Sequence, residues 1–511
     1  MASNQSNPVI DLALETIRMG KQALVFVNTR PSAEKTAEDI SKKLKDDEKA
    51  ILLAEKALKA LQKPTRQCER LSNIMRKAIA FHHAGLHPKQ RELIEDSFKA
   101  GDVRIICCTP TLAQGVDLPA FRSIIRDLKR YGGPWGLSYI PVLEYEQMAG
   151  RAGRPKFDEY GEAIIIAGSE GEKEEIYDRY ICGEPEDIYS KLAVEPVLRT
   201  YLLSLISSNF VNSKKQIMDF FEKTYWAYQY RDMDRMDVII SKMLDLLEDW
   251  EFIISEGDDF VSADKVDDRG YRATLVGNRV AELYLDPLTA HMLIESLRTA
   301  ASKRFSDFSF LHMISSTLEI RPPLRVKSKE FDMVQSRFLK YEDQLIAEEP
   351  SSFDPDYGQF ISTVKTALFF VGWIDELDEE ALLEQFDIRP GEIRSKLDIA
   401  DWLLYSSEEL AKLMQFRELF GHLMKLRLRV KHGIREELLN LVRFRGIGRV
   451  RARILFRNGI RDVAEIRRAD LSTLSSLVGR RTAESLKEQV GQKLEPVRSG
   501  KRRGQKSVRD Y

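Results

Sequence analysis

Cysteine is scarce in this sequence of 511 residues, and so are long apolar runs. The four cysteines form no CxxC pair and have no histidine cluster nearby, which argues against a zinc site or a disulfide framework. The most apolar run, residues 366–374, is far shorter than the roughly 20 residues that span a bilayer. No basic segment followed by an apolar stretch opens the chain. We therefore expect no signal peptide, no membrane contact, no bound metal of its own and a cytoplasmic location.

Charge of one sign is not in excess over the whole chain, whose formal net charge is −1. It is unevenly distributed, however. Residues 421–511 hold 24 Lys and Arg against 9 Asp and Glu, a net charge of +15. A strongly basic end on a near-neutral protein favours contact with nucleic acid. The alternative is a basic tail without a fixed partner.

The pattern of apolar residues divides the chain into segments of different class. Residues 1–190 alternate short buried-strand runs with helical stretches, which predicts an α/β domain built on a parallel sheet. The strand runs are residues 23–27, 103–108 and 162–167. Mainly helical domains are predicted to follow at 197–285, 286–414 and 427–490, before a disordered basic tail at 500–511. In the first of these, the runs 252–255 and 260–262 around a Gly-Asp-Asp turn predict a small β-hairpin.

The sharpest motif is QMAGRAGRP at residues 147–155. Arg151 and Arg154 are three positions apart, which places them on neighbouring positions of one helical turn or loop. Each guanidinium is a permanent, planar set of donors that suits phosphate oxygens. Such groups can neutralise the charge that builds on a transferring γ-phosphoryl group. With Gln147, these arginines are the candidate catalytic residues; a surface turn rich in Arg and Gly is the alternative.

Three further motifs precede this one. TPTLAQGVDLP at residues 109–119 directly follows a predicted strand. Its hydroxyl, glycine and carboxylate groups therefore lie just beyond a strand's carboxyl end, where open α/β sheets bind ligands. FHHAGL at residues 81–86 leads into Lys89, and VFVNTR occupies residues 25–30.

In their order and strand context, these four motifs resemble the second motor domain of superfamily-two helicases, and MAGRAGRP resembles the Ski-like group. The tail sequence RFRGIGRVRAR at 443–453 and the segment 391–405 resemble the archaeal DNA-repair helicases. Those enzymes are related to the helicase part of DNA polymerase theta and to the POLQ-like helicase. The resemblance covers nearly the whole chain. It implies a RecA-like motor domain at 1–190, a winged helix at 197–285, a helical ratchet domain at 286–414 and a helix-hairpin-helix domain at 427–490.

The resemblance also implies roles for single residues of the motor domain. The residues expected to face ATP are Gly115, Asp117, Gln147, Arg151 and Arg154. The residues expected to contact DNA are Asn28, Thr29, His83 and Thr109.

A hairpin is predicted at about 121–142, where two strand-like arms flank a turn rich in Gly and Pro. In the family, a hairpin at this place parts the duplex. Tyr131 and Trp135, near its tip, could stack on the last base pair, an interaction worth roughly 1–3 kcal/mol per base. An ordinary hairpin with packed aromatic side chains is the alternative.

Two DNA contacts are implied farther along the chain. Arg394 and Trp402 are eight residues apart, about 80° around an ideal helix, and the family uses a basic and an aromatic residue there to hold successive bases. Trp402 could equally belong to the core. In the tail, a tight turn could direct backbone amides at a phosphate between flanking arginines, or be merely structural. Its residues are Gly446, Gly448, Arg449, Arg451 and Arg453.

The sequence departs from the family pattern in one large respect. It contains neither the GxxxxGK[ST] loop that cradles phosphates nor a DExH box after a suitable strand. We therefore expect ATP and Mg²⁺ to be used only when a first motor domain completes the chain, in cis or in trans. The leading hypothesis is the C-terminal portion of a 3′-to-5′ DNA helicase that acts on forked or single-stranded DNA in repair and recombination. The alternatives are an RNA helicase of the same group and a non-catalytic DNA-binding regulator.

The extreme C-terminus carries a weak docking signal. Gln505, Val508 and Tyr511 have the spacing of a shortened box by which repair proteins bind the sliding clamp. A short tail can fold on binding and insert an aliphatic and an aromatic anchor into a pocket. The alternative is a basic tail that adds phosphate contacts.

Overall fold

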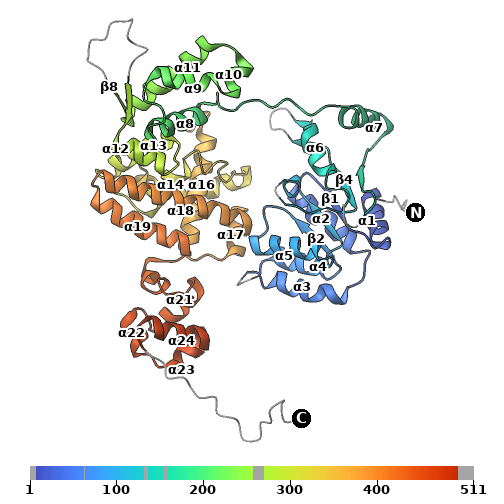
Figure 1. The fold of residues 1–511 in the computed structure, drawn as a ribbon. Helices are drawn as coiled ribbons and strands as arrows, with labels where there is room; N and C mark the ends of the chain where they lie inside the picture. Colours follow the sequence, from blue (N-terminus) through green and yellow to red (C-terminus); the bar gives the residue numbers. More distant parts are fainter. Residues whose placement is uncertain are drawn as a thin grey trace. The chain divides into compact units, whose positions relative to one another are not determined.

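The computed structural model describes residues 7–61, 64–114, 116–131, 136–154, 158–256 and 270–492. By its internal contacts, the chain divides into two compact units. The first comprises Met1–Ala290 together with Asp378–Leu397, and the second comprises His291–Leu377 together with Asp398–Tyr511 (Figure 1). The segment Asp378–Leu397 therefore packs with a domain that lies far from it in the sequence.

A five-stranded parallel sheet forms the centre of the first α/β domain. Its strands have the order β2-β3-β1-β4-β7. Their bounds are β1 Ala23–Phe26, β2 Ile79–His82, β3 Ile105–Cys108, β4 Arg122–Ile125 and β7 Glu162–Ile165. All residues of the first four strands are buried, so both faces of the sheet are covered. The predicted α/β class is confirmed, and each of the three predicted runs contains a strand.

Six helices accompany this sheet. They are α1 Pro8–Arg18, α2 Arg30–Ser41, α3 Glu48–Leu58, α4 Arg66–Met75, α5 Pro88–Lys99 and α6 Val142–Ala149. Their apolar faces share one core with the strands, in which Phe26, Phe81 and Phe98 are almost fully buried. Cys107 and Cys108 lie in that core as free thiols, and burial raises the pKa of both. These two cysteines are packing residues, as expected from their apolar context.

The predicted hairpin is present but shorter than expected. Strands β5 (Lys129–Tyr131) and β6 (Leu137–Tyr139) pair antiparallel, with Lys129 opposite Tyr139. Residues 122–125, which the prediction included in the first arm, instead form β4 of the main sheet. After the sheet come α7 (Glu170–Ile176) and the short π-helix η3 (Tyr177–Ile181).

Helices dominate the remainder of the first unit. They are α8 Glu195–Ser207, α9 Lys214–Glu222, α10 Tyr225–Tyr230, α11 Met233–Asp249 and α12 Leu275–Glu282, followed by α13 Pro287–Ala300 at the boundary. Strand β8 (Ile253–Glu256) pairs with β9 (Gly270–Ala273). The first predicted run of this hairpin contains most of β8, and the second, 260–262, falls within residues 257–269, which lie outside the described residues.

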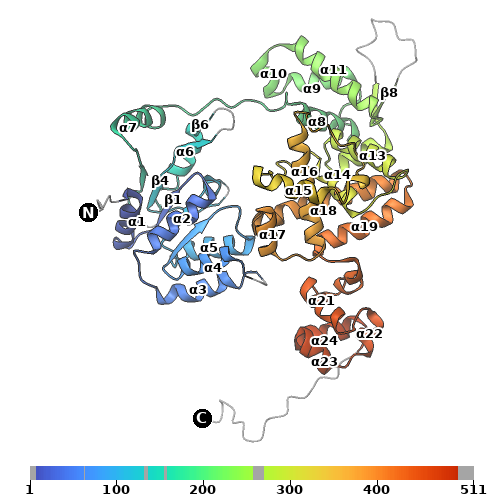
Figure 2. The same ribbon diagram turned by 180° about the vertical axis from the view of Figure 1, so that it is seen from behind.

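Helices also build the second unit (Figure 2). They are α14 Asp307–Ser315, α15 Phe331–Phe338, α16 Tyr357–Ile374 and α19 Arg417–His432. Helices α17 (Glu379–Phe386) and the start of α18 (Pro390–Leu413) belong to the first unit, and α18 continues into the second. The indole of Trp373 on α16 donates a 2.7 Å hydrogen bond to the carbonyl of Val430, so α19 packs with this helical group.

A small helical core completes the described chain. It is built from α20 Leu439–Val442, α21 Arg449–Arg457, α22 Val463–Arg468, α23 Leu471–Val478 and α24 Arg480–Gln489. Its buried apolar residues begin at Ile434 and end at Val490, close to the predicted 427–490. Among the described residues, no helix combines the length and the apolar character that crossing a membrane requires.

Candidate functional site

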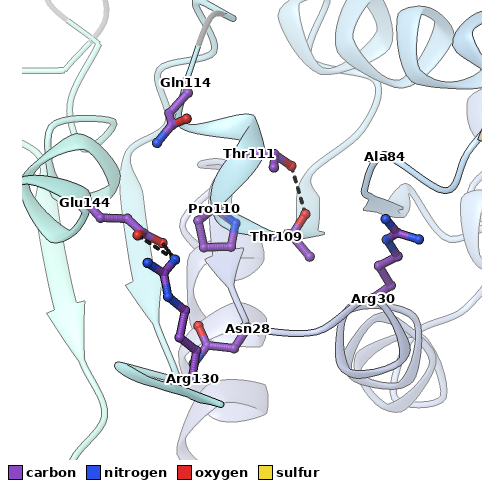
Figure 3. A pocket seen from close by; sticks show the side chains of 9 residues that line it. All are labelled: Asn28, Arg30, Ala84, Thr109, Pro110, Thr111, Gln114, Arg130 and Glu144. Atoms are coloured by element: carbon purple, nitrogen blue, oxygen red, sulfur yellow. Dashed lines mark hydrogen bonds and ion pairs between the residues drawn. The ribbon is translucent and has the colours of Figure 1, made fainter. Parts of the chain in front are cut away.

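A pocket of about 320 Å³ lies at the carboxyl ends of three neighbouring strands. Asn28 follows β1 closely, Ala84 follows β2 and Thr109 follows β3 (Figure 3). The full lining is Asn28, Arg30, Ala84, Thr109, Pro110, Thr111, Gln114, Arg130 and Glu144. The motifs at 25–30, 81–86 and 109–119 thus meet at one edge of the sheet, where open parallel sheets place their ligands.

Polar groups in this pocket are already ordered by contacts with each other. The hydroxyls of Thr109 and Thr111 are 2.9 Å apart, and an Arg130 nitrogen lies 2.8 Å from a Glu144 carboxylate oxygen (Figure 3). Asn28 donates its side-chain amide to the carbonyl of Lys129. Since Lys129 and Arg130 belong to β5, the hairpin and the pocket form one structure. Sequence reasoning missed Arg130 and Glu144, which belong to no motif.

The pocket's rim also touches the start of α18. The amide of Gly391 donates a 3.1 Å hydrogen bond to the carbonyl of Gly85, and Arg30 pairs with Glu392. A Cβ at Gly391 would lie only 2.1 Å from the carbonyl oxygen of Ala84, so this close approach requires glycine. The loop 84–86 and the first turn of α18 therefore pack backbone against backbone.

His83 is fully buried, which corrects its assignment as a DNA contact. The amide of Gly85 donates to Nδ1, so Nε2 carries the proton and donates to a Glu34 oxygen 3.1 Å away. Burial lowers the pKa of His83 despite that carboxylate, which keeps the ring neutral at pH 7. With both nitrogens engaged, His83 positions the loop and does not contact DNA in this conformation.

Thr29 has a structural task as well. It is the N-cap of α2, and its hydroxyl accepts the amide of Ser32 at 3.2 Å. Its hydroxyl oxygen is therefore committed to the helix, and a DNA contact by Thr29 would have to share it. Asn28 and Thr109 remain on the pocket surface, where the sequence predicted them.

The arginine motif lies at the opposite edge of the sheet. Ala120 and Gln22 precede β4 and β1, and the amide of Gly153 bonds to the carbonyl of Ala120. Four-residue strands separate the two edges by about 13 Å, at roughly 3.3 Å per residue. Gly153 has φ +94°, and a Cβ at Gly161 would lie 2.1 Å from its nitrogen, so the motif's turn requires glycine at both places.

The guanidinium of Arg154 is held by residues at this same edge of the sheet. Its Nε lies 2.7 Å from an Asp158 carboxylate oxygen, and its Nη1 donates to the Gln22 side chain at 2.9 Å. Hydrogen bonds from Arg154 and Lys21 lower the pKa of Asp158 to about 2. To contact a phosphate, the guanidinium of Arg154 would have to exchange Asp158 for it.

Arg151 holds the loop that follows β3. Its Nε donates to the carbonyl of Ala113 at 3.2 Å, and Nη1 lies 3.7 Å from Asp117, whose side chain is 94% exposed. Gln147 lies on α6, and its buried Oε1 accepts no hydrogen bond from the described residues. The planar guanidinium of Arg151 is a set of donors that suits phosphate oxygens. Gly115 and Trp135 lie outside the described residues, and the side chain of Tyr131 does too.

Known families match three parts of the sequence. Residues 6–156 match the helicase conserved C-terminal domain, residues 308–433 match archaeal helicase domain 4, and residues 436–491 match the SAM-like helix-hairpin-helix tandem. Relatives match almost the whole chain. The ATP-dependent DNA helicase Hel308 of Pyrococcus abyssi is 36% identical over 501 residues, which cover 96% of this chain and 67% of the relative. The chain belongs to the Hel308 family.

Two further relatives agree. The Hel308 helicase of Pyrococcus horikoshii is 37% identical over 95% of this chain and 66% of its own length. That of Methanococcus vannielii is 34% identical over 95% of this chain and 68% of its own length. The chain thus spans about two thirds of the length of its Hel308 relatives. Its α/β domain is RecA-like, and its tail is a helix-hairpin-helix domain, as the sequence predicted.

Two of the three tail arginines of this Hel308-family chain make contacts with the helical domain. Arg453 lies 2.5 Å from a Glu376 oxygen and 2.8 Å from a Glu437 oxygen. These hydrogen bonds raise the pKa of Arg453, whose side chain is only 19% exposed. Arg453 therefore joins the tail domain to the end of the helical domain, and a phosphate contact would have to replace Glu376 or Glu437.

Arg449 is engaged in the same way. Its guanidinium carbon lies 4.6 Å from the ring centroid of Trp373, and a nitrogen donates to the carbonyl of Leu377 at 3.1 Å. Arg451 is exposed and donates to the carbonyl of Gly446, whose φ of +86° forms the turn. Gly448 is the N-cap of α21. Of the three predicted phosphate contacts, only Arg451 has the exposure that the role needs.

The two ratchet residues lie on the same helix of the Hel308-family chain, as predicted. Arg394 and Trp402 are both on α18; Arg394 is exposed and Trp402 is half-buried. Leu403 and Leu404, next to Trp402, are fully buried and belong to the core. Trp402 itself keeps an exposed part, so the core alternative and the DNA-contact alternative both stay open for it. The roles of Arg394 and Trp402 on DNA stay predictions.

A matched pair of tail variants tests the revised assignment. In forms of the chain that bind single-stranded DNA, Arg451→Ala is expected to lower the slope of log K against log salt by about 0.7, because one phosphate contact is lost. Arg453→Ala is expected to leave that slope unchanged and to lower the melting temperature, because it breaks an internal ion-pair network. Fluorescence anisotropy at several salt concentrations measures the slope. An equal change of slope in both variants would restore the original assignment.

Proposed function

We propose that the chain is the DNA-tracking, C-terminal portion of an ATP-dependent 3′-to-5′ DNA helicase that acts on forked or single-stranded DNA in repair and recombination. The observation that carries this proposal is the division of the RecA-like sheet into two working edges. The carboxyl edge holds a polar pocket built from three helicase motifs, and the backbone of the arginine motif lies at the amino edge, against Ala120. The relatives that this chain matches over about two thirds of their length are named DNA helicases, which supports the choice of DNA.

ATP chemistry in this proposal requires a second set of residues. The 511 residues contain no Gly-rich phosphate loop and no acidic box, so the phosphate cradle and the Mg²⁺ ligands belong to a first motor domain, in cis or in trans. The described chain supplies guanidinium and amide donors that suit a γ-phosphate. Its residues orient the nucleotide and neutralise charge during phosphoryl transfer.

The remaining domains are assigned to the DNA strand. We propose a winged helix at 197–285, a ratchet domain at 286–414 with Arg394 and Trp402 on the bases, and a tail that grips the backbone near Gly446 and Arg451. The β5–β6 hairpin is the proposed element that parts the duplex. A sliding clamp bound through Gln505, Val508 and Tyr511 stays a prediction on residues outside the described part of the chain.

A binding and turnover experiment tests this function. The purified chain is expected to bind forked and 3′-tailed DNA, and to show no ATPase above background even with saturating DNA. Adding a first motor domain that carries the Gly-rich loop is expected to produce DNA-stimulated ATPase. Equal affinity for RNA of the same form would favour the RNA helicase. Failure of the added domain to produce any turnover would favour a non-catalytic DNA-binding protein.

A further inference from the structure

The aromatic ring of Tyr139, on β6 of the hairpin, lies between two cations. The Lys129 ammonium is 4.4 Å from its ring centroid, and the Arg179 guanidinium carbon is 5.1 Å away. The Tyr139 hydroxyl donates a 2.7 Å hydrogen bond to Glu175. Lys129 comes from the hairpin itself, whereas Arg179 and Glu175 come from η3 and α7. The hairpin is thus attached to the segment that follows the sheet.

A second contact fixes the other strand of the hairpin. The Lys129 ammonium lies 3.1 Å from a Glu172 carboxylate oxygen, and the other Glu172 oxygen accepts the amide of Gly168 at 2.8 Å. Contacts with Tyr139 and Glu172 raise the pKa of Lys129. The amide of Gly168 and Lys129 lower the pKa of Glu172, so both partners are charged at pH 7. One face of α7 therefore holds both strands of the hairpin at their base.

The same segment also holds the beginning of α6. The N-cap residue of α6 is Pro141, which has no side-chain acceptor to offer. Glu186 replaces it: its two carboxylate oxygens accept the amides of Val142 at 2.7 Å and Leu143 at 3.2 Å. A carboxylate at this position satisfies unpaired amides and complements the helix dipole.

A buried tyrosine joins the two attachments. The Tyr180 hydroxyl donates a 2.7 Å hydrogen bond to the carbonyl of Ile140, a residue between β6 and α6 in the chain. The ring centroid of Tyr180 lies 5.0 Å from that of Tyr145 on α6. Tyr180 belongs to the π-helix η3, a rare helical form that is frequent at functional sites. A Cβ at Gly183 would lie 2.0 Å from the carbonyl oxygen of Arg179, so the turn after η3 is closely packed.

These contacts matter because the hairpin is too small to keep a fixed orientation without support from other elements. Its strands have three residues each, and an isolated two-stranded ribbon is marginally stable in water. Helix α6, in contrast, carries Gln147 and leads directly into Arg151 and Arg154. The segment 170–186 touches both.

We propose that residues 170–186 form a bracket that fixes the hairpin to helix α6, so that the strand-parting element and the arginine motif move as one body. Glu172, Arg179 and Glu186 are its positioning residues. One consequence rests on the proposed function: loosening the bracket is expected to uncouple duplex opening from DNA binding. It assigns no contact with substrate to the bracket itself.

A matched pair of variants tests the bracket in the full chain without ATP. Glu172→Lys places a like charge beside Lys129, whereas Glu170→Lys makes the same charge change on the same helix, at a residue that pairs with Lys173 and not with the hairpin in the described part of the chain. Hydrogen exchange of the peptide that includes β5 and β6 is expected to be several-fold faster in Glu172→Lys and unchanged in Glu170→Lys. The double variant Lys129→Glu/Glu172→Lys is expected to restore part of the protection.

Glu186→Gln tests the other end of the bracket. The first-turn amides of α6 are expected to exchange about threefold to tenfold faster, the range for losing one exposed hydrogen bond. Equal exchange in parent and variants at both ends would overturn the bracket.

The functional consequence is measured as the fluorescence of 2-aminopurine placed in the first base pair of a forked DNA. Binding of the parent chain is expected to raise its fluorescence, and Glu172→Lys is expected to lose most of that rise with an unchanged Kd for single-stranded DNA. A full rise in Glu172→Lys would overturn the coupling. Absence of any rise with the parent would overturn the proposed role of the hairpin, while the exchange data would still decide whether the bracket holds it.

Discussion

ATP turnover by the chain completed with a first motor domain is expected to fall about 10³-fold or more in Arg151→Ala, the range for losing an arginine that stabilises a transferring phosphoryl group. Arg151 lies at the amino edge of the sheet, where the carbonyl of Ala113 orients its guanidinium. Arg151 is not among the residues that line the pocket at the carboxyl edge, which is the part of the sheet proposed to face DNA. The Kd for DNA is therefore expected to stay unchanged.

The control for this prediction is Arg104→Ala, which removes the same charge from the same domain. The side chain of Arg104 makes a long, 3.4 Å hydrogen bond to the carbonyl of Gly20. Arg154→Ala is a poorer probe, because it also leaves the buried carboxylate of Asp158 with fewer partners. Steady-state ATPase and fluorescence anisotropy measure the two quantities. Parallel losses of turnover and DNA affinity would show that Arg151 serves both ligands or the fold.

Replacing Glu34 by glutamine is expected to destabilise the RecA-like domain in a pH-dependent manner. Burial alone raises the pKa of Glu34, but hydrogen bonds from His83 and Gln67 and the charge of Arg70 outweigh it and lower that pKa to about 2. The shift from 4.5 corresponds to roughly 3 kcal/mol of unfolding free energy. Because the Arg70 side chain is 42% exposed, we expect about 2 kcal/mol.

The sign of the effect follows from the depressed pKa. Glu34 stabilises the folded state fully above pH 4.5, the unfolded value, and loses that contribution as the pH falls toward 2. Chemical unfolding at pH 7 and pH 3.5 should therefore show a large gap between parent and Glu34→Gln that narrows on acidification. Glu38→Gln is the matched control, since Glu38 bonds the same Arg70 from a more exposed position. A gap that is equal at both pH values would contradict this role of Glu34.

The sequence sufficed for the elements whose signal is local. The strands at 23–26 and 105–108 are continuous apolar runs, and the hairpin is marked by its Gly and Pro residues. Strand β4 escaped detection because Arg122 and Ser123 interrupt its apolar run. Both are nevertheless buried: Arg122 pairs with Glu15 and Glu162, and Ser123 bonds to the carbonyl of Met148. Partners so distant in sequence leave no local pattern.

The same reason limits what the sequence predicts about single residues of the site. A motif indicates which loop lies at the site, but not which side chains of the loop face outward. His83 turns inward, where its Nε2 donates a hydrogen bond to Glu34 on α2. Arg453 faces Glu376, 77 positions earlier, although its neighbours in the motif suggest a row of phosphate contacts. Asn28 and Thr109, whose positions follow from the ends of strands, line the pocket, and their contact with DNA stays a prediction.

The most direct test of the central claim is strand displacement by the chain together with a first motor domain. Two duplexes of the same sequence are compared, one with a 3′ single-stranded tail and one with a 5′ tail. The proposed function predicts ATP-dependent displacement of the 3′-tailed DNA duplex and little of the other. Displacement that is absent from both, or that favours the 5′ tail, would contradict it.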